Sequence, residues 1–403
     1  MKSRLLGSIL IVAGTTIGAG MVAMPLASAG IGFGATFIMM VALWALMCYS
    51  ALMLLEVHQY SAANAGLGSL AEQCFGAAGR WIASGSMAFL MYALIAAYIT
   101  GGGGQLSHNL QRWASLEISP LQGTLLFTLL LGGAVCISTR AVDALNRVLF
   151  SIKVLALILM LALMLPHVEG PNLLAMPLQQ GLVLSAIPVI FTSFGFHGSI
   201  PSLVRYLDGD TRKLRVVLII GSAIPLFAYI LWQLATHGSI SQSAMGSILA
   251  ENPNLTGLMQ AVDRVVANPK VDVAVRVFAD MALATSFLGV TLGMFDFLAD
   301  AFRRTDSVGG RLQTGVLTFT PPLIFALFYP QGFVMALGYA AIALAVLALL
   351  LPAAMAWKTR RQYAHGYRVV GGVAGLVVVF TTGIVIIAVQ LASTFGWLPP
   401  VAG

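Results

Sequence analysis

The stretch GTTIGAGMVAMP, residues 14–25, decides how this chain is interpreted, because it interrupts an apolar segment with residues that form helices poorly. Three glycines and two threonines lie within its first seven positions. Glycine leaves helical backbone angles at no steric cost and lets a ligand approach the backbone closely. We therefore interpret this stretch as a helix that is unwound near its middle. Gly14 and Gly18 also form a GxxxG pattern, which on its own is typical of helix packing in membranes.

The composition indicates that most of the chain is surrounded by lipid. The chain has 403 residues, of which 59% are hydrophobic and 9% are charged, and its mean hydropathy is +0.92. A soluble domain carries roughly 25% charged residues. A water-soluble protein could not bury so much apolar surface. We predict an all-α, polytopic membrane protein, with residues 1–403 forming one transmembrane domain.

Eleven stretches are long and apolar enough to be membrane-spanning helices. A hydrocarbon core of about 30 Å requires about 20 apolar residues in a helix. The short connections at 30–33 and 330–332 predict tight antiparallel hairpins. The predicted spans are residues 5–29, 34–56, 81–104, 119–138, 148–166, 181–200, 215–237, 275–298, 313–329, 333–355 and 372–394.

The basic residues predict the orientation of these spans, since Lys and Arg are enriched in cytoplasmic loops. With the N-terminus inside, most of the 21 Lys and Arg residues lie on the cytoplasmic side or at inner helix ends. Only Arg112, Arg264, Lys270 and Arg276 then fall on the outer side. We therefore predict a cytoplasmic N-terminus and a C-terminus on the opposite side of the membrane.

The first span has a second interpretation as a cleavable signal peptide. Lys2 and Arg4 precede an apolar run that ends in the small residues Ala27, Ser28 and Ala29. The run is long for a signal peptide, and its centre is rich in glycine rather than leucine. Both features favour a span that is retained.

Eleven spans divide into two blocks of five and one extra helix. Because five is odd, the second block enters the membrane in the opposite orientation to the first, as in the inverted repeats of many secondary transporters. We predict a first repeat over about 5–166, a second over about 181–355 and an extra helix over 372–394. This division predicts that the sixth span, like the first, is interrupted.

The sixth span does contain residues that suit an interruption. Its centre reads SAIPVIFTSFGFHGS, residues 185–199, with Pro188 followed by serine, threonine and glycine. Unwound backbone is tolerated at membrane depth where it lines a cavity. A half-helix N-terminus attracts a carboxylate, and freed carbonyl groups attract an ammonium. Two facing interruptions therefore favour a site for an amino acid zwitterion.

These two stretches, GTTIGAGMVAMPLASAG and AIPVIFTSFGFHGSIPS, resemble the bacterial hydroxy and aromatic amino acid permease family of the amino acid–polyamine–organocation superfamily. The segments LWALMCYSALMLLEVHQY, RVLFSIKVLALILMLALMLPH and VGGRLQTG are similar to that family too. The resemblance covers essentially the whole chain. It implies a leucine-transporter-type fold, a periplasmic C-terminus and proton-driven symport of L-tyrosine across the bacterial inner membrane.

The resemblance also implies which residues bind the substrate and the proton. The superfamily holds the amino and carboxylate groups at the two interruptions, and the third helix contributes to the side-chain pocket. A lysine on the fifth helix of proton-coupled relatives stands where sodium-coupled relatives bind a cation. The matching substrate residues here are Thr15, Thr16, Ile17, Gly18, Ala19, Gly20, Phe191, Thr192, Ser193, Phe194 and Gly195, with Tyr92 and Tyr98 as candidates on the third helix.

Three groups of polar residues within the spans are candidates for ion coupling. Intramembrane charge is costly and marks function by default, although Lys153 could instead extend its side chain to the inner headgroups. His197 could exchange a proton or serve a structural role. Thr285 and Ser286 resemble the hydroxyl pair of sodium-coupled relatives, but an ammonium at the same place would repel sodium. We therefore expect coupling to protons through Lys153.

Other functions are less well supported by the sequence. A tryptophan or broad aromatic amino acid permease, sodium coupling, and a channel or sensor without coupled transport remain alternatives. We expect no enzyme activity, cofactor, metal site, nucleic-acid binding or obligate protein partner; the expected partners are L-tyrosine, protons and lipid. The run Gly101 to Gly104 lacks the following helix and lysine of a phosphate-binding loop, and we expect it to end the third span.

Overall fold

The computed structural model describes residues 2–175, 177, 181–251, 254–266, 269–304, 307–399 and 401, and the regular structure within them is helical. The α-helices are α1 Lys2–Thr16, α2 Ala19–Ser28, α3 Gly32–His58, α4 Leu67–Ala114, α5 Pro120–Ile137, α6 Thr139–Met164, α7 Gly170–Leu174, α8 Leu182–Thr192, α9 Ile200–Tyr206, α10 Thr211–Ser239, α11 Gln242–Glu251, α12 Leu255–Val266, α13 Pro269–Ala301, α14 Val308–Phe328, α15 Phe333–Ala345, α16 Leu351–Gln362 and α17 Gly372–Thr394. Two 3-10 helices, η1 Leu165–His167 and η2 His197–Ser199, and one π-helix, η3 Val346–Leu350, complete them.

Within the described residues, nine helical segments are long and apolar enough to cross a membrane. A tenth is the pair α1 and α2, which is bent by 48°. The predicted span 313–329 corresponds to α14, which contains Pro321 and Pro322 and is not apolar enough to be counted with the others. A polytopic membrane protein is therefore confirmed, whereas the number of eleven spans stays a prediction.

Helix α4 is much longer than the span predicted at 81–104. It bends at Gly76, where φ is +67°, and continues to Ala114. The prediction that Gly101 to Gly104 end this helix is wrong. A Cβ on Gly102 would lie 2.4 Å from the ring of Phe127, and one on Gly103 would lie 2.5 Å from Cα of Thr124. These glycines instead allow α5 to pack closely against α4.

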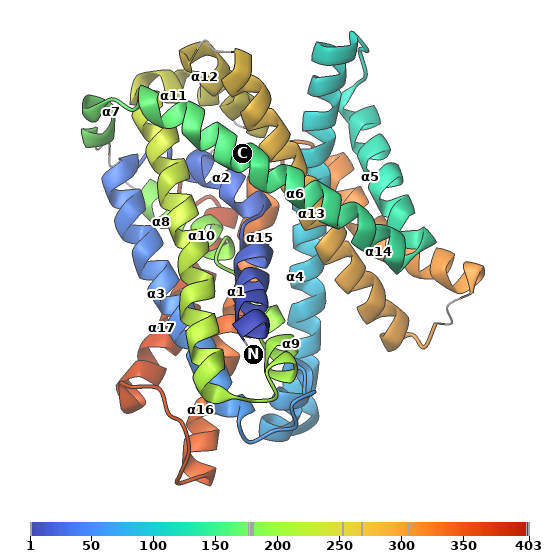
Figure 1. Ribbon diagram of the computed structural model, residues 1–403, viewed down its shortest axis with the longest axis vertical. Coiled ribbons are helices and arrows are strands. Elements are labelled where there is room, and N and C mark those ends of the chain that lie inside the picture. Colours follow the sequence, from blue (N-terminus) through green and yellow to red (C-terminus); the bar gives the residue numbers. More distant parts are fainter. Residues whose placement is uncertain are drawn as a thin grey trace.

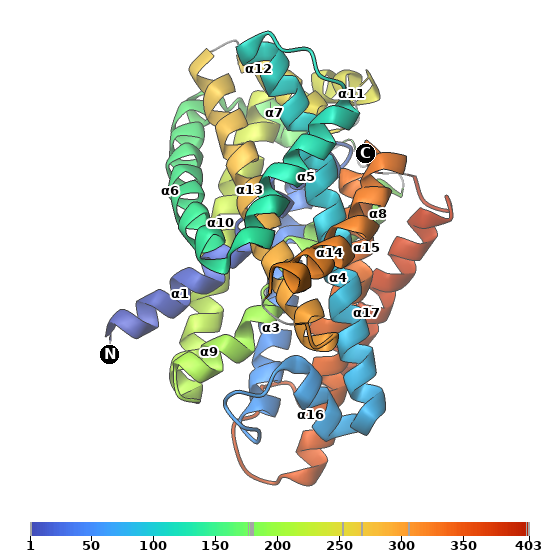
Figure 2. The ribbon, with the colours of Figure 1, turned by 90° about the vertical axis from the view of Figure 1, so that its right-hand side faces the viewer.

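The bundle is elongated, and the helix breaks lie in its interior. Helices α11 and α12 lie at the upper end in Figures 1 and 2, and α16 reaches the lower end. The N-terminus lies in the lower half and the C-terminus in the upper half in both views. Figure 2 shows α1 entering the bundle from the side.

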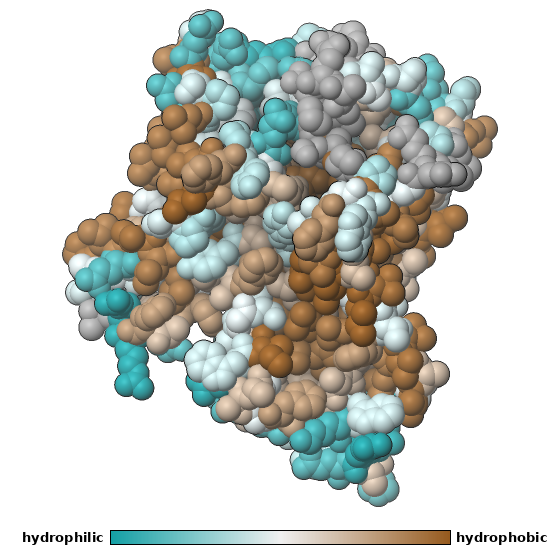
Figure 3. Space-filling view, turned by 180° about the vertical axis from the view of Figure 1, so that it is seen from behind, coloured by the Kyte–Doolittle hydropathy of each residue, from teal (hydrophilic) through white to brown (hydrophobic). Residues whose placement is uncertain are grey.

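The outer surface is rich in large apolar side chains, as a lipid-facing surface requires. Viewed from behind, hydrophobic residues cover much of the middle of the molecule, and hydrophilic residues gather at its two ends (Figure 3). Exposed apolar residues elsewhere lie on α5, α6 and α17, and they include Leu129, Leu130, Leu155, Ile158, Val377 and Ile384.

Candidate functional site

The first helix is interrupted after Thr16 and starts again at Ala19. Gly18 between them is extended, with φ −156° and ψ −154°. The N–H of Ala19, left unpaired by the break, donates to Oγ of Ser286 on α13 at 3.1 Å. A Cβ on Gly18 would lie 2.5 Å from the same Oγ. Glycine at 18 therefore allows the unwound chain to lie directly against α13.

The second interruption separates α8 from η2. Residues 193–196 between them are not helical, and His197 of η2 is buried. Ser50 on α3 donates its single hydroxyl hydrogen to the carbonyl of Ala348 in the π-helix η3. Ser50 must then accept from Nε2 of His197, 2.8 Å away. This chain of contacts places the hydrogen of a neutral His197 on Nε2, and it joins the break to η3.

Tyr229 on α10 connects the two interruptions. Its hydroxyl lies 2.6 Å from the carbonyl oxygen of Thr16 and 2.9 Å from that of Ser193, so one hydrogen is shared between two carbonyls. The ring of Tyr229 also packs edge-on against Phe194. The side chain is fully buried. One residue outside both broken helices thus satisfies a carbonyl of each.

The two interruptions also touch directly. A Cβ on Gly20 would lie 2.7 Å from Oγ of Ser193 and 3.0 Å from its Cα. Because the second of these atoms belongs to the backbone, a side chain at position 20 could not be accommodated by a rotamer change. The α2 half-helix is therefore held against the end of α8.

Lys153 on α6 lies beneath the first interruption and is 3% exposed. Its Nζ donates to the carbonyl of Ile17 at 2.8 Å and to Oγ1 of Thr285 at 3.3 Å. The same Nζ lies 4.6 Å from the ring centre of Phe150. No carboxylate of the described chain forms an ion pair with it. Two acceptors satisfy both hydrogens of a neutral amine, whereas the third hydrogen of an ammonium would have only the face of the Phe150 ring.

Both candidate cation ligands on α13 already accept a hydrogen bond. Thr285 donates to the carbonyl of Met281 at 2.8 Å, so its oxygen is free to accept from Lys153. Ser286 accepts from the N–H of Ala19. A side-chain amine and a backbone amide therefore occupy the hydroxyl pair that resembles a sodium site. The described residues contain no group of three or more His, Cys, Asp and Glu side chains placed to bind a metal.

A cavity of about 430 Å³ adjoins the two interruptions. Its lining combines polar groups of both interruptions with apolar side chains, which include Leu90, Met91 and Leu94 of α4. The predicted site residues that line the cavity are Thr15, Ile17, Tyr98, Lys153, Gly195, His197, Thr285 and Ser286.

The remaining predicted substrate residues do not line this cavity. Tyr92 instead donates to the carbonyl of Leu317 on α14 at 2.8 Å. Thr192 donates to the carbonyls of Pro188 and Leu337, so its hydroxyl joins α8 to α15. Those that pack within or between the broken helices are Thr16, Gly18, Ala19, Gly20, Phe191, Ser193 and Phe194.

Sequence reasoning missed several residues at the site. Tyr229 was not singled out, although a tyrosine in the middle of a predicted span is a signal for a buried hydroxyl with a partner. Asn146 and Phe150 line the cavity from the same helix face as Lys153. The buried Oδ1 of Asn146 has no hydrogen-bond partner among the described residues.

Comparison with known proteins agrees with a transporter of amino acids. The model of the tryptophan/tyrosine permease family matches residues 1–390. The chain belongs to this family. It is accordingly an aromatic amino acid permease and a multi-pass protein of the bacterial inner membrane, rather than an enzyme.

Three relatives of this permease share its full length. Tyrosine-specific transport system 1 of Haemophilus influenzae is 47% identical over 403 residues, covering 100% of both chains. Tyrosine-specific transport system 2 of the same organism is 46% identical over 405 residues, again covering 100% of both. A tryptophan-specific transport protein of that organism is 37% identical and covers 99% of the permease and 98% of the relative.

Proposed function

We propose that the permease imports L-tyrosine by proton symport and holds it at the two interruptions. The proposed location is supported by a cavity that adjoins both breaks and combines polar backbone with apolar side chains. An amino acid zwitterion would exchange its own charged groups for the side chains that now satisfy the backbone there. Tyrosine is favoured as the substrate because the relatives at 46% and 47% identity are named for tyrosine, and the tryptophan-specific relative is more distant.

Coupling to protons is supported by the surroundings of Lys153. A cation in contact with Thr285 would lie next to an ammonium, so sodium is disfavoured at that place. The neutral amine, in contrast, has both hydrogens bonded to Ile17 and Thr285. Proton exchange at Lys153 would change the hydrogen bonding of the α1–α2 break directly. This single contact, Nζ to the carbonyl of Ile17, carries the coupling proposal.

The proposed topology is an inverted repeat of about 5–166 and 181–355, with the N-terminus in the cytoplasm. Its support is that the first helix of each block is interrupted. Cysteine labelling can test the orientation, because a cysteine introduced at Arg140 should be reached only from the cytoplasm.

Transport in sealed vesicles tests the function. Purified permease in liposomes should accumulate labelled L-tyrosine above equilibrium when the outside is more acidic, and a protonophore should abolish the accumulation. Vesicles without protein give the background. Accumulation that needs sodium and ignores the pH gradient would contradict proton coupling, and downhill flux without accumulation would indicate a channel.

Competition tests the choice of substrate. Unlabelled L-tyrosine should inhibit uptake more strongly than L-tryptophan or L-phenylalanine, since a buried group that hydrogen-bonds the phenol is left unpaired by phenylalanine. Equal inhibition by all three would identify a broad aromatic permease. Stronger inhibition by tryptophan would place the permease with its tryptophan-specific relatives.

A further inference from the structure

A crevice unrelated to the broken helices lies on the outer surface between α16, α17 and the beginning of α4. It measures about 870 Å³ and is lined by Phe75, Ala353, Ala354, Trp357, Lys358, Arg361, Gln362, Leu376, Val377, Phe380 and Thr381. We propose that this crevice binds an anionic phospholipid, with an acyl chain along α17 and the phosphate between Lys358 and Arg361.

The apolar lining of the crevice suits an acyl chain. Leu376, Val377 and Phe380 of α17 line it together with Trp357 of α16. Trp357, Val377 and Phe380 are exposed even though they are large and apolar. Burying their surface under a hydrocarbon chain is favourable and has no directional requirement. Apolar surface of this kind indicates contact with lipid.

The rim of the crevice is positively charged. Lys358 lies 5.7 Å from the ring centre of Phe75, and the guanidinium of Arg361 lies 5.0 Å from that of Trp357. Neither forms an ion pair with any carboxylate of the described chain. Both cations are therefore held beside the apolar wall with their charge uncompensated. Basic pockets between membrane helices attract anionic lipid headgroups.

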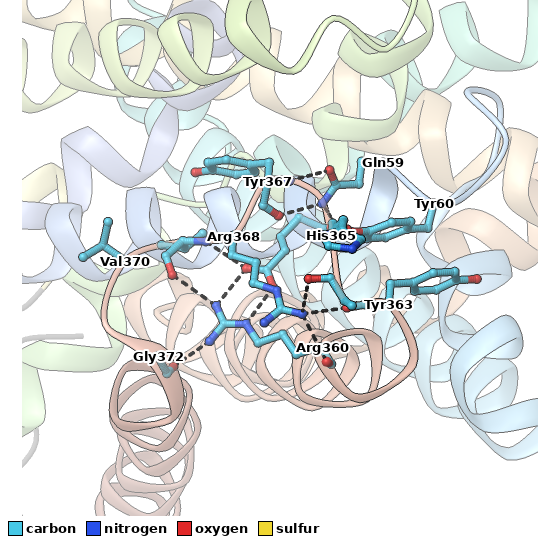
Figure 4. Close-up of polar contacts among 12 residues, drawn as sticks. Gln59, Tyr60, Arg360, Tyr363, His365, Tyr367, Arg368, Val370 and Gly372 are labelled. Atoms are coloured by element: carbon cyan, nitrogen blue, oxygen red, sulfur yellow. Dashed lines mark hydrogen bonds and ion pairs between the residues drawn. The ribbon is translucent and has the colours of Figure 1, made fainter.

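The carboxylate that contacts α16 is already occupied. Glu56 of α3 binds Arg360, and it also accepts from the N–H of Val369. Figure 4 shows Arg360 turned toward the chain at 369–372, and Arg368 bonded to backbone carbonyls of 360–364. Glu56 thus neutralises Arg360 alone, and the rim keeps an excess of positive charge.

A second hollow of about 380 Å³ continues the crevice past Trp357 and Arg361, and Arg360, Arg368 and Gly372 also line it. A headgroup placed at Arg361 could extend into it. The same charge disfavours a second copy of the permease as the occupant, since two copies would bring like charges together. A phosphodiester of net charge −1 complements the rim, whereas a zwitterionic headgroup adds its own ammonium to it.

Native mass spectrometry of the detergent-purified permease tests the proposal with phosphatidylglycerol and phosphatidylethanolamine of identical acyl chains in equal amounts. Wild type should retain phosphatidylglycerol in preference. The variant Lys358→Gln/Arg361→Gln should lose about tenfold of that preference, which corresponds to about 1.4 kcal/mol. The control Arg140→Gln/Arg212→Gln removes the same charge from exposed residues outside the crevice and should behave as wild type.

Several outcomes would overturn the proposal. Wild type could retain both lipids equally, or the crevice and control variants could lose the preference equally, which would indicate attraction by net charge alone. A dimer seen in place of bound lipid would likewise reject it. If the double variant does not fold, the single variant Arg361→Gln can replace it in this test. If that single variant retains phosphatidylglycerol with the wild-type preference, the proposed lipid site is wrong. These results do not depend on the proposed transport function.

Discussion

Glu56 and Arg360 form a two-point ion pair that joins the end of α3 to α16. Nε and Nη2 of Arg360 lie 2.6 and 2.8 Å from the two carboxylate oxygens, and Glu56 is 1% exposed. The carboxylate also accepts from the N–H of Val369 at 2.9 Å. The side-chain amide of Gln59 donates to the carbonyl of Tyr367 and accepts from its N–H (Figure 4). The connection between α16 and α17 is therefore fixed to α3.

Replacing Glu56→Gln should loosen this connection, because the amide keeps the shape but removes the charge and one acceptor. We expect amide hydrogen exchange at 366–370 to become roughly tenfold faster or more, because the free energy needed to open this segment locally would be lower. The control is Glu72→Gln, whose pair with Arg80 is exposed and spans 3.5 Å. Unchanged exchange in the Glu56 variant would show that Gln59 and the backbone suffice.

Replacing Lys153→Gln should separate binding from coupling. The amide can still donate to the carbonyl of Ile17, so tyrosine exchange down its own gradient should persist. Accumulation driven by a pH gradient should fall by about tenfold or more, since typical couplings of 1–3 kcal/mol are lost. Vesicle uptake with and without the gradient measures both. Gradient-driven accumulation at the wild-type level would remove Lys153 from the mechanism.

Replacing Gly18→Ala should abolish uptake by displacing the unwound chain from α13, because the new Cβ would meet Oγ of Ser286 at 2.5 Å. The double variant Gly18→Ala/Ser286→Ala removes the clashing oxygen and should recover part of the activity. Gly20→Ala should not be recovered by Ser193→Ala, since Cα of Ser193 lies 3.0 Å from the added carbon. Equal recovery in both pairs would contradict this geometry.

Replacing Tyr229→Phe should destabilise the permease by about 1–3 kcal/mol, the cost of leaving a buried acceptor without its donor. Thermal unfolding in detergent measures the change. Tyr92→Phe is a matched control, because it also removes one hydroxyl bonded to a carbonyl, but that carbonyl belongs to Leu317 on α14 and to neither interruption. Tyrosine affinity should fall in the Tyr229 variant alone. An equal loss in both would indicate a purely structural role.

Replacing Asp272→Asn should destabilise the permease by about 3–5 kcal/mol, the range found when one partner of a buried ion pair is removed. Arg276, whose side chain is 0% exposed, would lose the carboxylate that lies 2.5 Å away, and Arg112 would lose the same carboxylate at 3.0 Å. The exposed pair of Asp143 and Arg147 has the same four-residue spacing. Asp143→Asn should cost about 0–1 kcal/mol. Similar melting temperatures for both variants would contradict the assigned burial.

The sequence predicts helices best where one continuous apolar run is bounded by polar or turn-forming residues. The predicted spans 34–56 and 372–394 agree closely with α3 and α17, because each of these helices is such a run. The prediction for 81–104 fails at both ends of α4. At its C-terminal end the helix continues through glycines and polar residues that pack against other parts of the protein, and at its N-terminal end it includes the largely exposed residues 72–78, so hydropathy is no guide to its length.

The site is less predictable than the helices, since it depends on contacts between distant segments. Both interruptions could be located from their glycine, serine and threonine content. The role of Tyr229 could not be predicted, because hydropathy does not reveal which face of α10 meets the two breaks. The same holds for Tyr92, whose hydroxyl turns out to bond α14. Roles that depend on substrate and protons stay predictions.

The hydrogen bonds at the two interruptions leave the empty permease with backbone groups of its unwound segments already paired. Ser286, Tyr229 and Lys153 occupy amide and carbonyl groups that unwinding exposes. In the binding mode proposed above, the cargo would displace interactions that the permease already makes. Loading would then be an exchange of partners, and a molecule that fits poorly would leave the original partners in place.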